Sequence, residues 1–237
     1  MPFKSLGLPD YFDEALEALN YSKPYPIQEK AIPAVLSGRD VLGIAQTGSG
    51  KTAGYVLPIL TRLEGKAVTR NRHINTLVLV PTRELAIQVA EVFKTFGESL
   101  PFPFKSMAVH GGVSINPQMK GLMNVNVLIA TPGRLLELYA SNAVHFDSIS
   151  TLVLDEADKM LSLGFKDELS RIMALLPPSR QNLLFSATLS PDVNAVKELL
   201  LKKPLLIETE IKEEADENIK QTGYFVSPEQ KGPLLRY

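Results

Sequence analysis

The sequence predicts an α/β fold in three layers, in which helices cover both faces of a doubly wound, mostly parallel sheet. Two observations support this prediction. Short runs of β-branched and other apolar residues alternate along the chain with segments at helical spacing. Several of these runs are apolar almost throughout, as strands covered on both faces must be. Repeated crossovers from strand to helix to strand then build one sheet around one core.

The elements follow in order along the chain. A first helix is expected at 8–19, and a second at 27–36 after Pro24 and Pro26, which favour extended backbone before it. Residues 65–75 are polar and basic, as in a surface loop. Strands are expected at 40–44, 76–80, 105–109, 125–130, 151–154, 182–185 and 205–207. Further helices are expected after residue 52 and at 83–96, 134–139, 166–176 and 191–201.

The composition limits the classes of function. The chain has 237 residues, of which 45% are hydrophobic and 22% charged, as in a soluble globular protein. Its net charge of -1 means that any nucleic-acid binding must come from a local patch. It has no cysteine, which excludes disulfides and thiolate metal sites. Because we find neither a secretion signal nor an apolar run of the roughly 20 residues that span a membrane, we expect a cytoplasmic protein, with the nucleus as the alternative.

A glycine-rich segment after the strand at 40–44 predicts a phosphate-binding loop. It consists of Ala45, Gln46, Thr47, Gly48, Ser49, Gly50, Lys51 and Thr52. Backbone N–H groups at such a loop converge on an anion, and glycines allow the backbone to come close because they lack a Cβ. Lys51 would contact the β- and γ-phosphates, and the Thr52 hydroxyl would ligate Mg²⁺. The alternative is an ordinary glycine-rich turn, and Ala45 departs from the general pattern, which has glycine there.

Two adjacent carboxylates, Asp155 and Glu156, follow the strand at 151–154. At a strand tip Asp155 could hold Mg²⁺ through water, and Glu156 could orient or deprotonate an attacking water. The alternative is that both merely begin the next helix, where carboxylates are favoured. The phosphate loop upstream weakens this alternative because such a loop needs a magnesium site.

Hydroxyl residues follow the strand at 182–185. Ser186 and Thr188 could hydrogen-bond Asp158 and so connect the nucleotide site to its surroundings. The alternative is that they cap the next helix. Ser190 is the better cap because it directly precedes Pro191.

Gln28 and the histidines have less specific surroundings. A buried glutamine at position 28 could offer a donor and an acceptor to a planar ligand, but spacing alone favours a solvated side chain at a helix start. His73, His110 and His145 are isolated and show no metal-ligand spacing.

Together these motifs resemble those of the DEAD-box RNA helicase family. They occur in the family's order, from about Phe3 to Thr188. The segments that match are the glycine-rich loop and residues 81–86, 131–134, 155–158 and 186–188. This family normally has alanine where Ala45 stands, so that departure disappears.

The resemblance implies a RecA-like P-loop NTPase domain over residues 1–207, with an adenine-reading segment at 3–28. Gln28 would read the adenine edge, Tyr21 would stack on the ring, and Phe3 would assist, so that ATP is selected over GTP. In catalysis, Lys51 and Thr52 would hold the phosphates and Mg²⁺, Asp155 the metal, and Glu156 the hydrolytic water. Ser186 and Thr188 would couple hydrolysis to strand separation through Asp158.

The resemblance also implies RNA binding through backbone contacts that are not sequence-specific. The residues concerned are Pro81, Thr82, Arg83, Glu84, Gly111, Gly112, Thr131, Pro132, Gly133 and Arg134. By themselves these segments would be interpreted as turns. Arg134 could instead be the structural partner of a carboxylate.

A second RecA-like domain belongs to the family pattern, and its motifs are missing from this sequence. We expect an acidic linker at 208–218 and the start of a truncated second domain at 219–237, with a strand near 219–226. The expected function is that of the N-terminal domain of an ATP-dependent RNA helicase. Because arginines from the second domain can contribute about 10³ to 10⁵ in rate, the chain alone would hydrolyse ATP weakly. The alternative is a non-catalytic module that binds nucleotide and RNA.

Overall fold

The computed structural model describes residues 2–65, 71–209 and 222–235. Within these residues lies one seven-stranded sheet with the strand order β3-β4-β2-β5-β6-β1-β7. Each neighbouring pair of strands runs parallel. The predicted doubly wound sheet is therefore confirmed, and it is parallel throughout.

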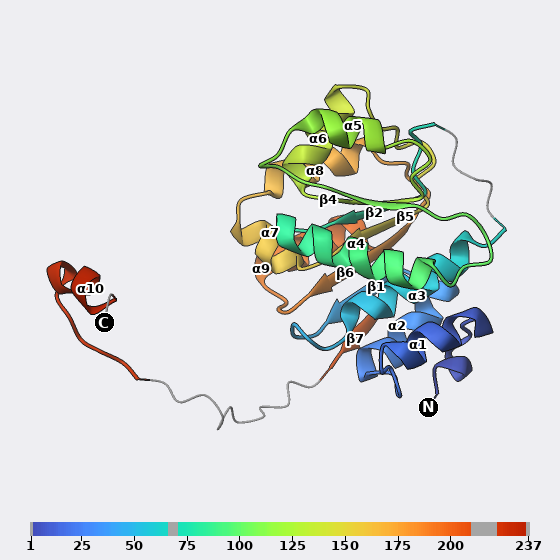
Figure 1. Ribbon diagram of the computed structural model, residues 1–237, viewed down its shortest axis with the longest axis horizontal. Helices are drawn as coiled ribbons and strands as arrows, with labels where there is room; N and C mark the ends of the chain where they lie inside the picture. The colour runs from blue at the N-terminus through green and yellow to red at the C-terminus, as the bar shows by residue number, and fades with distance from the viewer. Residues whose placement is uncertain (1, 66–70, 210–221, 236–237) are drawn as a thin grey trace.

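The strands lie at the centre of the α/β domain (Figure 1). They are β1 (Val41–Ile44), β2 (Thr76–Leu79), β3 (Ser106–Val109), β4 (Val127–Ala130), β5 (Thr151–Leu154), β6 (Gln181–Ser186) and β7 (Leu205–Glu208). Each matches a predicted strand, and only the ends differ, by one or two residues.

Two hydrophobic cores flank the sheet because alternate residues of a strand face opposite sides. On one side Val153 and Leu183 pack with side chains of α2 (Pro26–Leu36), α3 (Lys51–Leu63) and α4 (Arg83–Gly97). On the other side Leu152 and Leu184 pack with α6 (Pro132–Ala140), α8 (Lys166–Leu175) and α9 (Pro191–Leu200). This arrangement confirms the three-layer fold.

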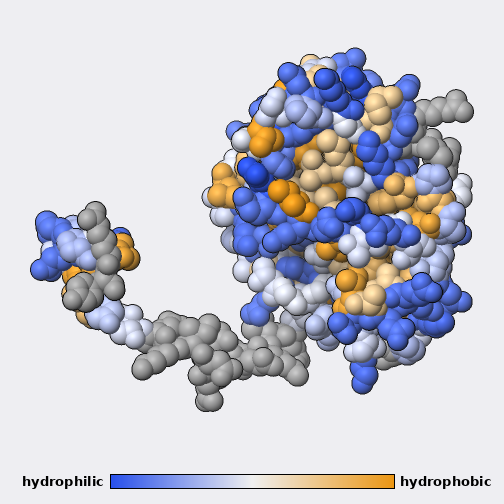
Figure 2. Space-filling view, viewed as in Figure 1, coloured by the Kyte–Doolittle hydropathy of each residue, from blue (hydrophilic) through white to orange (hydrophobic). Residues whose placement is uncertain are grey.

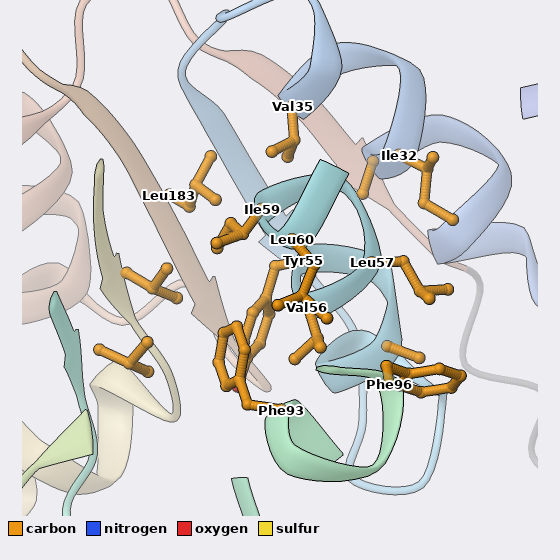
Figure 3. Packing of buried hydrophobic residues seen from close by; sticks show 14 of the residues in the cluster. Ile32, Val35, Tyr55, Val56, Leu57, Ile59, Leu60, Phe93, Phe96 and Leu183 are labelled. Atoms are coloured by element: carbon orange, nitrogen blue, oxygen red, sulfur yellow. The ribbon is translucent and has the colours of Figure 1, made fainter. Parts of the chain in front are cut away.

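Helix α3 is held firmly in the first of these cores. Its Leu57 and Leu60 are fully buried and lie among side chains of α2 and α4, which include Phe93 (Figure 3). Burial of one such side chain contributes roughly 1.5–3 kcal/mol. The helix therefore gives a rigid support to Lys51, its first residue.

Several helices differ from the sequence prediction. The segment 8–19 is not one helix: Pro9 is extended, a 3₁₀ turn covers Asp10–Phe12, and α1 (Asp13–Ala18) is short. Helix α6 begins two residues earlier than predicted because a proline fits its first position. A 3₁₀ turn at Phe3–Leu6 and the helices α5 (Ile115–Gly121) and α7 (Ala157–Ser162) were not predicted. Asparagine, proline and glycine in α5 are weak helix formers.

The C-terminal predictions are tested only in part. Glu208 pairs with Ile44 as part of β7, so the acidic linker does not begin at residue 208. Residues 210–221 lie outside the described residues, as do 66–70 of the basic loop predicted at 65–75. Residues 222–227 have no regular secondary structure, and α10 (Pro228–Leu234) follows them without a buried residue. A strand over 222–226 is therefore not formed in this structure.

The surface of the α/β domain mixes residue types. Hydrophobic side chains are scattered among hydrophilic ones on the face shown in Figure 2. Among the described residues, no helix has both the length and the hydropathy needed to cross a bilayer.

Candidate nucleotide-binding site

The sheet order brings the predicted motifs to one edge. Strands β5, β6 and β1 are neighbours, and the predicted phosphate loop, the two carboxylates and the hydroxyl residues follow their carboxyl ends. A pocket of about 850 Å³ opens there. Its lining includes Tyr21, Tyr25, Thr47, Gly48, Gly50, Lys51, Thr52, Asp155 and Glu156. Two motifs separated by about a hundred residues therefore face the same space.

The phosphate loop has the backbone that its glycines predict. Gly48 and Gly50 both have a φ of 82°, in the left-handed region that glycine tolerates. The loop tip from Gln46 to Gly48 is exposed, whereas Ala45 is buried, and the Ser49 hydroxyl donates to the Gln46 carbonyl at 2.7 Å. The loop then continues directly into α3.

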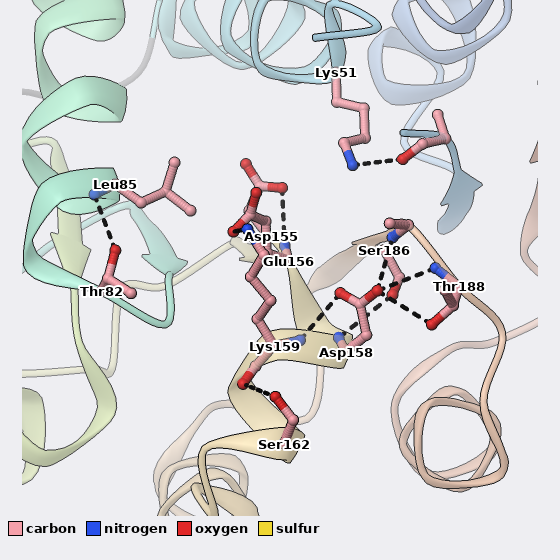
Figure 4. Close-up of polar contacts among 12 residues, drawn as sticks. Lys51, Thr82, Leu85, Asp155, Glu156, Asp158, Lys159, Ser162, Ser186 and Thr188 are labelled. Atoms are coloured by element: carbon pink, nitrogen blue, oxygen red, sulfur yellow. Dashed lines mark hydrogen bonds and ion pairs between the residues drawn. The ribbon is translucent and has the colours of Figure 1, made fainter. Parts of the chain in front are cut away.

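Lys51 is buried, and its Nζ donates to the Ala45 carbonyl at 2.6 Å (Figure 4). The partner of this cation is thus a neutral oxygen within the loop. Burial of a cation is costly unless it is paired with an anion, and charge-assisted hydrogen bonds are the stronger ones. A phosphate group in the loop would supply that anion, so the residues present fit a nucleotide.

Asp155 is 2% exposed at the end of β5, and both of its oxygens accept hydrogen bonds. Oδ1 accepts from the backbone N–H of Glu156 at 2.9 Å, and Oδ2 accepts from the Tyr55 hydroxyl at 2.8 Å. Burial raises the pKa of Asp155, while the bond from Tyr55 and the charge of Lys51 act against this rise. Burial, and then the charge of Asp155, hold the pKa of Tyr55 well above its usual value.

Glu156 has an unusual backbone. Its φ of 52° and ψ of 50° place a non-glycine residue in the left-handed region, which costs of order 1–3 kcal/mol and is typical of functional sites. The side chain pairs with Lys159 at 2.9 Å and borders the pocket. This turn lets the chain pass from β5 into α7 while Asp155 and Glu156 both stay at the pocket.

The predicted bonds between Asp158 and the hydroxyl segment are present (Figure 4). The carboxylate Oδ2 of Asp158 accepts from the backbone N–H groups of Ala187 and Thr188 and from the Thr188 hydroxyl, at 3.1–3.2 Å. The Ser186 hydroxyl accepts from the Asp158 N–H at 3.3 Å. The structure therefore confirms that this segment contacts Asp158, and Ser190 instead caps α9.

Gln28 is fully buried in the first turn of α2. The prediction of a solvated side chain, which spacing alone favours, is therefore wrong. Its Oε1 accepts from the Tyr25 N–H and its Nε2 donates to the Gly50 carbonyl, both at 2.9 Å. Tyr25 and Gly50 line the pocket in place of Gln28. The amide keeps one N–H and one lone pair for a further partner, and adenine recognition stays a prediction.

The two predicted aromatic residues occupy different positions. Tyr21 lines the pocket, with its ring edge-on to Phe3 at 6.1 Å and to Phe96 at 5.9 Å between centroids. Phe3 is buried behind Tyr21 and is not part of the lining. Phe3 therefore packs behind Tyr21, and its part in adenine binding stays a prediction.

The predicted RNA-binding segments also lie together, because β3, β4 and β2 are neighbours at one side of the sheet. Arg83, Glu84, Gly111 and Gly112 are exposed. Thr82, Thr131 and Gly133 are half-buried, whereas Pro81 and Pro132 are buried. The Thr82 hydroxyl also caps α4 by accepting from the Leu85 N–H at 3.2 Å.

Arg134 has the structural position that the alternative interpretation predicts. It is 7% exposed, its Nε donates to Glu137 at 2.9 Å, and its Nη2 donates to the Val113 carbonyl at 2.8 Å. These contacts connect α6 to the loop that follows β3. Arg134 thus holds α6 and this loop together from a buried position.

Four contacts were not predicted from the sequence. Tyr55 bonds Asp155, and a buried Asp40 bonds the backbone N–H groups of Asn182 and Lys202 at 2.8 and 2.7 Å. His73 and His145 are not isolated, because their ring centroids lie 4.9 Å apart. Each contact joins residues that are distant along the chain, so periodicity contains no signal for it.

The oxygen atoms of Thr52 and Asp155 at the pocket suit a magnesium ion. Among the described residues, no cluster of three or more His, Asp or Glu side chains could hold a metal ion. Mg²⁺ needs few protein ligands when phosphates and water complete its shell, and it prefers oxygen. Asp155 and Thr52 both supply oxygen at the pocket.

Comparison with known proteins agrees with this geometry. The model of the family described as DEAD/DEAH box helicase matches residues 25–196. The chain belongs to this family. It is 46% identical, over 86% of its length, to the ATP-dependent RNA helicase DRS1 of Eremothecium gossypii, of which it covers 28%. It is 40% identical, over 90% of its length, to the ATP-dependent RNA helicase CshA of Limosilactobacillus reuteri, of which it covers 42%.

A solved structure supports the assignment of this DEAD/DEAH box chain to the RecA-like fold. The crystal structure of a DEAD box protein from the hyperthermophile Methanococcus jannaschii superposes with a TM-score of 0.81 at 33% identity. The match covers 89% of this chain and 56% of that one. The chain thus spans less than two thirds of the relatives that it matches.

Proposed function

We propose that this chain is the N-terminal, ATP- and RNA-binding domain of an ATP-dependent RNA helicase. In the complete protein, RNA-stimulated ATP hydrolysis would drive local unwinding of RNA duplexes. The observation that supports this proposal is the shared pocket, in which Lys51 and Thr52 of the phosphate loop face Asp155 and Glu156. A cytoplasmic location stays a prediction from the sequence.

Each residue of the site has a role in this proposal. Lys51 would exchange the Ala45 carbonyl for phosphate oxygens, and Tyr21 would contact the base. Asp155 and Thr52 would hold Mg²⁺, which when bound with the nucleotide neutralises charge on the phosphate oxygens. Glu156 would orient the attacking water.

Hydrolysis would be coupled to RNA through Asp158. Four hydrogen bonds join Asp158 to residues 186–188, so a shift of the segment at 155–158 would move both segments together. RNA would contact the exposed residues Arg83, Gly111 and Gly112, where phosphates can meet a helix start and a basic side chain. A second RecA-like domain would complete this surface and supply arginines to the γ-phosphate.

Calorimetric titration of the chain with ATP, ADP and GTP tests the nucleotide assignment. We expect adenine nucleotides to bind and GTP to bind at least tenfold more weakly. Gln28→Ala should reduce this selectivity, because it removes the amide behind the Gly50 carbonyl. Lys51→Ala should weaken binding of both kinds of nucleotide.

An ATPase assay with and without single-stranded RNA tests the catalytic part. We expect slow turnover, because the arginines of a second domain contribute about 10³ to 10⁵ in rate. No detectable turnover with intact nucleotide binding would favour the non-catalytic module. Equal binding of GTP would contradict the proposed adenine site.

A further inference from the structure

Tyr55 is a fully buried residue of α3 whose ring and hydroxyl have different partners. Its ring lies 5.3 Å from that of Phe185 and 6.4 Å from that of Phe93, measured between centroids, and it is part of the core in Figure 3. Its hydroxyl points out of this aromatic group and donates to Asp155 Oδ2 at 2.8 Å. A phenylalanine would fill the same space, so packing alone does not require the hydroxyl.

The hydroxyl of Tyr55 connects α3, which carries Thr52, to Asp155. The phenol oxygen donates to Asp155 from the same helix that carries Thr52 near its start. Thr52 lies one turn before Tyr55 in α3, and Asp155 lies at the end of β5. One phenol oxygen therefore bridges the phosphate loop helix and the carboxylate strand.

The bond from Tyr55 restricts how the Asp155 carboxylate can turn. The Glu156 N–H holds Oδ1 and the Tyr55 hydroxyl holds Oδ2, so both oxygens are fixed from the protein side. A carboxylate has about four lone-pair positions, and these two bonds leave the others available to an ion or its water. Partners of this kind orient metal-binding carboxylates, and their loss typically costs 10- to 100-fold in metal affinity or activity.

We propose that Tyr55 is a positioning residue for the Mg²⁺ site, which holds the Asp155 carboxylate in the orientation that the ion needs. This inference rests on the proposed function, because it concerns the magnesium that accompanies the nucleotide. A purely structural role for the hydroxyl makes a different prediction. Its removal would then lower stability and leave the dependence of nucleotide binding on Mg²⁺ unchanged.

The test compares Tyr55→Phe with Tyr11→Phe in the full chain. Tyr11 is a matched control, since its hydroxyl also contacts a carboxylate, Glu64 at 3.3 Å, but outside the pocket. ADP binding is measured by calorimetry over a series of Mg²⁺ concentrations and in EDTA. We expect Tyr55→Phe to raise the Mg²⁺ concentration for half-maximal effect by about tenfold or more, while ADP affinity in EDTA stays that of the wild type. Tyr11→Phe should match the wild type in both.

The double variant with Asp155→Asn separates positioning from general damage. If the hydroxyl acts through the carboxylate, Tyr55→Phe should cause little further change in an Asp155→Asn background. An unchanged Mg²⁺ dependence in Tyr55→Phe, even with a lower thermal midpoint, would overturn the inference. Absence of adenine-nucleotide binding by the wild type would instead overturn the proposed function, and the inference with it.

Discussion

Gly50 is the residue at which the shape of the phosphate loop is most restricted. A Cβ at this position would lie 2.5 Å from Gln28 Nε2 and 2.8 Å from the Tyr25 ring. The φ of 82° is also unfavourable for any residue with a Cβ, by roughly 1–2 kcal/mol. A side chain here would therefore displace Gln28 and change the pocket wall.

We predict that Gly50→Ala lowers ATP affinity by more than about tenfold, which corresponds to roughly 1.4 kcal/mol. Gly65→Ala is the control, since Gly65 has a φ of 72° but nothing within 4 Å of an added Cβ. In urea unfolding, both variants should lose stability because of the positive φ, and Gly50→Ala should lose more because its Cβ also meets Gln28 and Tyr25. Only Gly50→Ala should lose affinity in calorimetry, and unchanged affinity would contradict the steric argument.

Arg134 and Arg83 differ in how each would contribute to the predicted RNA-binding surface. Arg134 is buried and bonds Val113 and Glu137, whereas Arg83 is exposed at the start of α4. We predict that Arg134→Met lowers the free energy of unfolding by about 1.5–3 kcal/mol, as for hydrogen bonds to charged groups. Arg83→Met should change it by less than about 0.5 kcal/mol.

RNA binding should be affected by Arg83→Met, the variant that is expected to keep near-normal stability. In fluorescence anisotropy with single-stranded RNA and a non-hydrolysable ATP analogue, Arg83→Met should reduce the salt dependence of binding by about one unit of slope. A normal stability of Arg134→Met would show that its buried contacts are unimportant.

At the scale of elements, caps determine where several helices begin. Helix α9 starts with Ser190, whose hydroxyl accepts from the Val193 N–H at 3.3 Å, and continues with proline at its first position. Helix α4 also has a hydroxyl N-cap, Thr82, although its first residue is Arg83 rather than proline. Both caps place the following helix directly after a site segment, so the caps also set the position of that segment.

We predict that Ser190→Ala lowers the free energy of unfolding by about 1 kcal/mol, the usual cost of a lost N-cap. Ser170→Ala is the control, because the Ser170 hydroxyl bonds back to the Lys166 carbonyl within α8 at 2.9 Å. Alanine is favourable inside a helix, so this control should be neutral or slightly stabilising. Equal effects of the two variants in urea unfolding would refute the cap.

At the scale of the whole molecule, Asp40 joins three parts of the chain at the end of the sheet opposite the pocket. It directly precedes β1, and its carboxylate accepts from Asn182 in β6 and from Lys202, shortly before β7. The side chain is 8% exposed. Its hydrogen bonds therefore hold the start of three neighbouring strands.

We predict that Asp40→Asn lowers the free energy of unfolding by about 1.5–3 kcal/mol, because charge-assisted bonds become neutral or are lost. Nucleotide affinity should stay within twofold, since the phosphate loop lies at the other end of β1. Glu91→Gln is the control, as Glu91 is paired with Lys94 at 3.7 Å on an exposed helix face and such pairs contribute little. A large loss of affinity in Asp40→Asn would contradict this separation.

The sequence by itself determined the features that depend on neighbouring residues. The strands were predictable because buried parallel strands are apolar on both faces, and the phosphate loop because its glycines, Lys51 and Thr52 are contiguous. The carboxylate pair at 155–156 and the cap at Ser190 were predictable for the same reason. Helices α5 and α7 were missed because they are short, and α5 is also rich in weak helix formers.

Only the tertiary structure decided which distant residues meet. The order of strands places β5 and β6 beside β1, and this order brings Asp155 to the phosphate loop. Packing buries Arg134 and Gln28 and seats the Tyr55 hydroxyl on Asp155. A hydrogen bond between residues a hundred positions apart leaves no periodic trace, because its partners are selected by the packing of helices on a sheet rather than by local backbone preference.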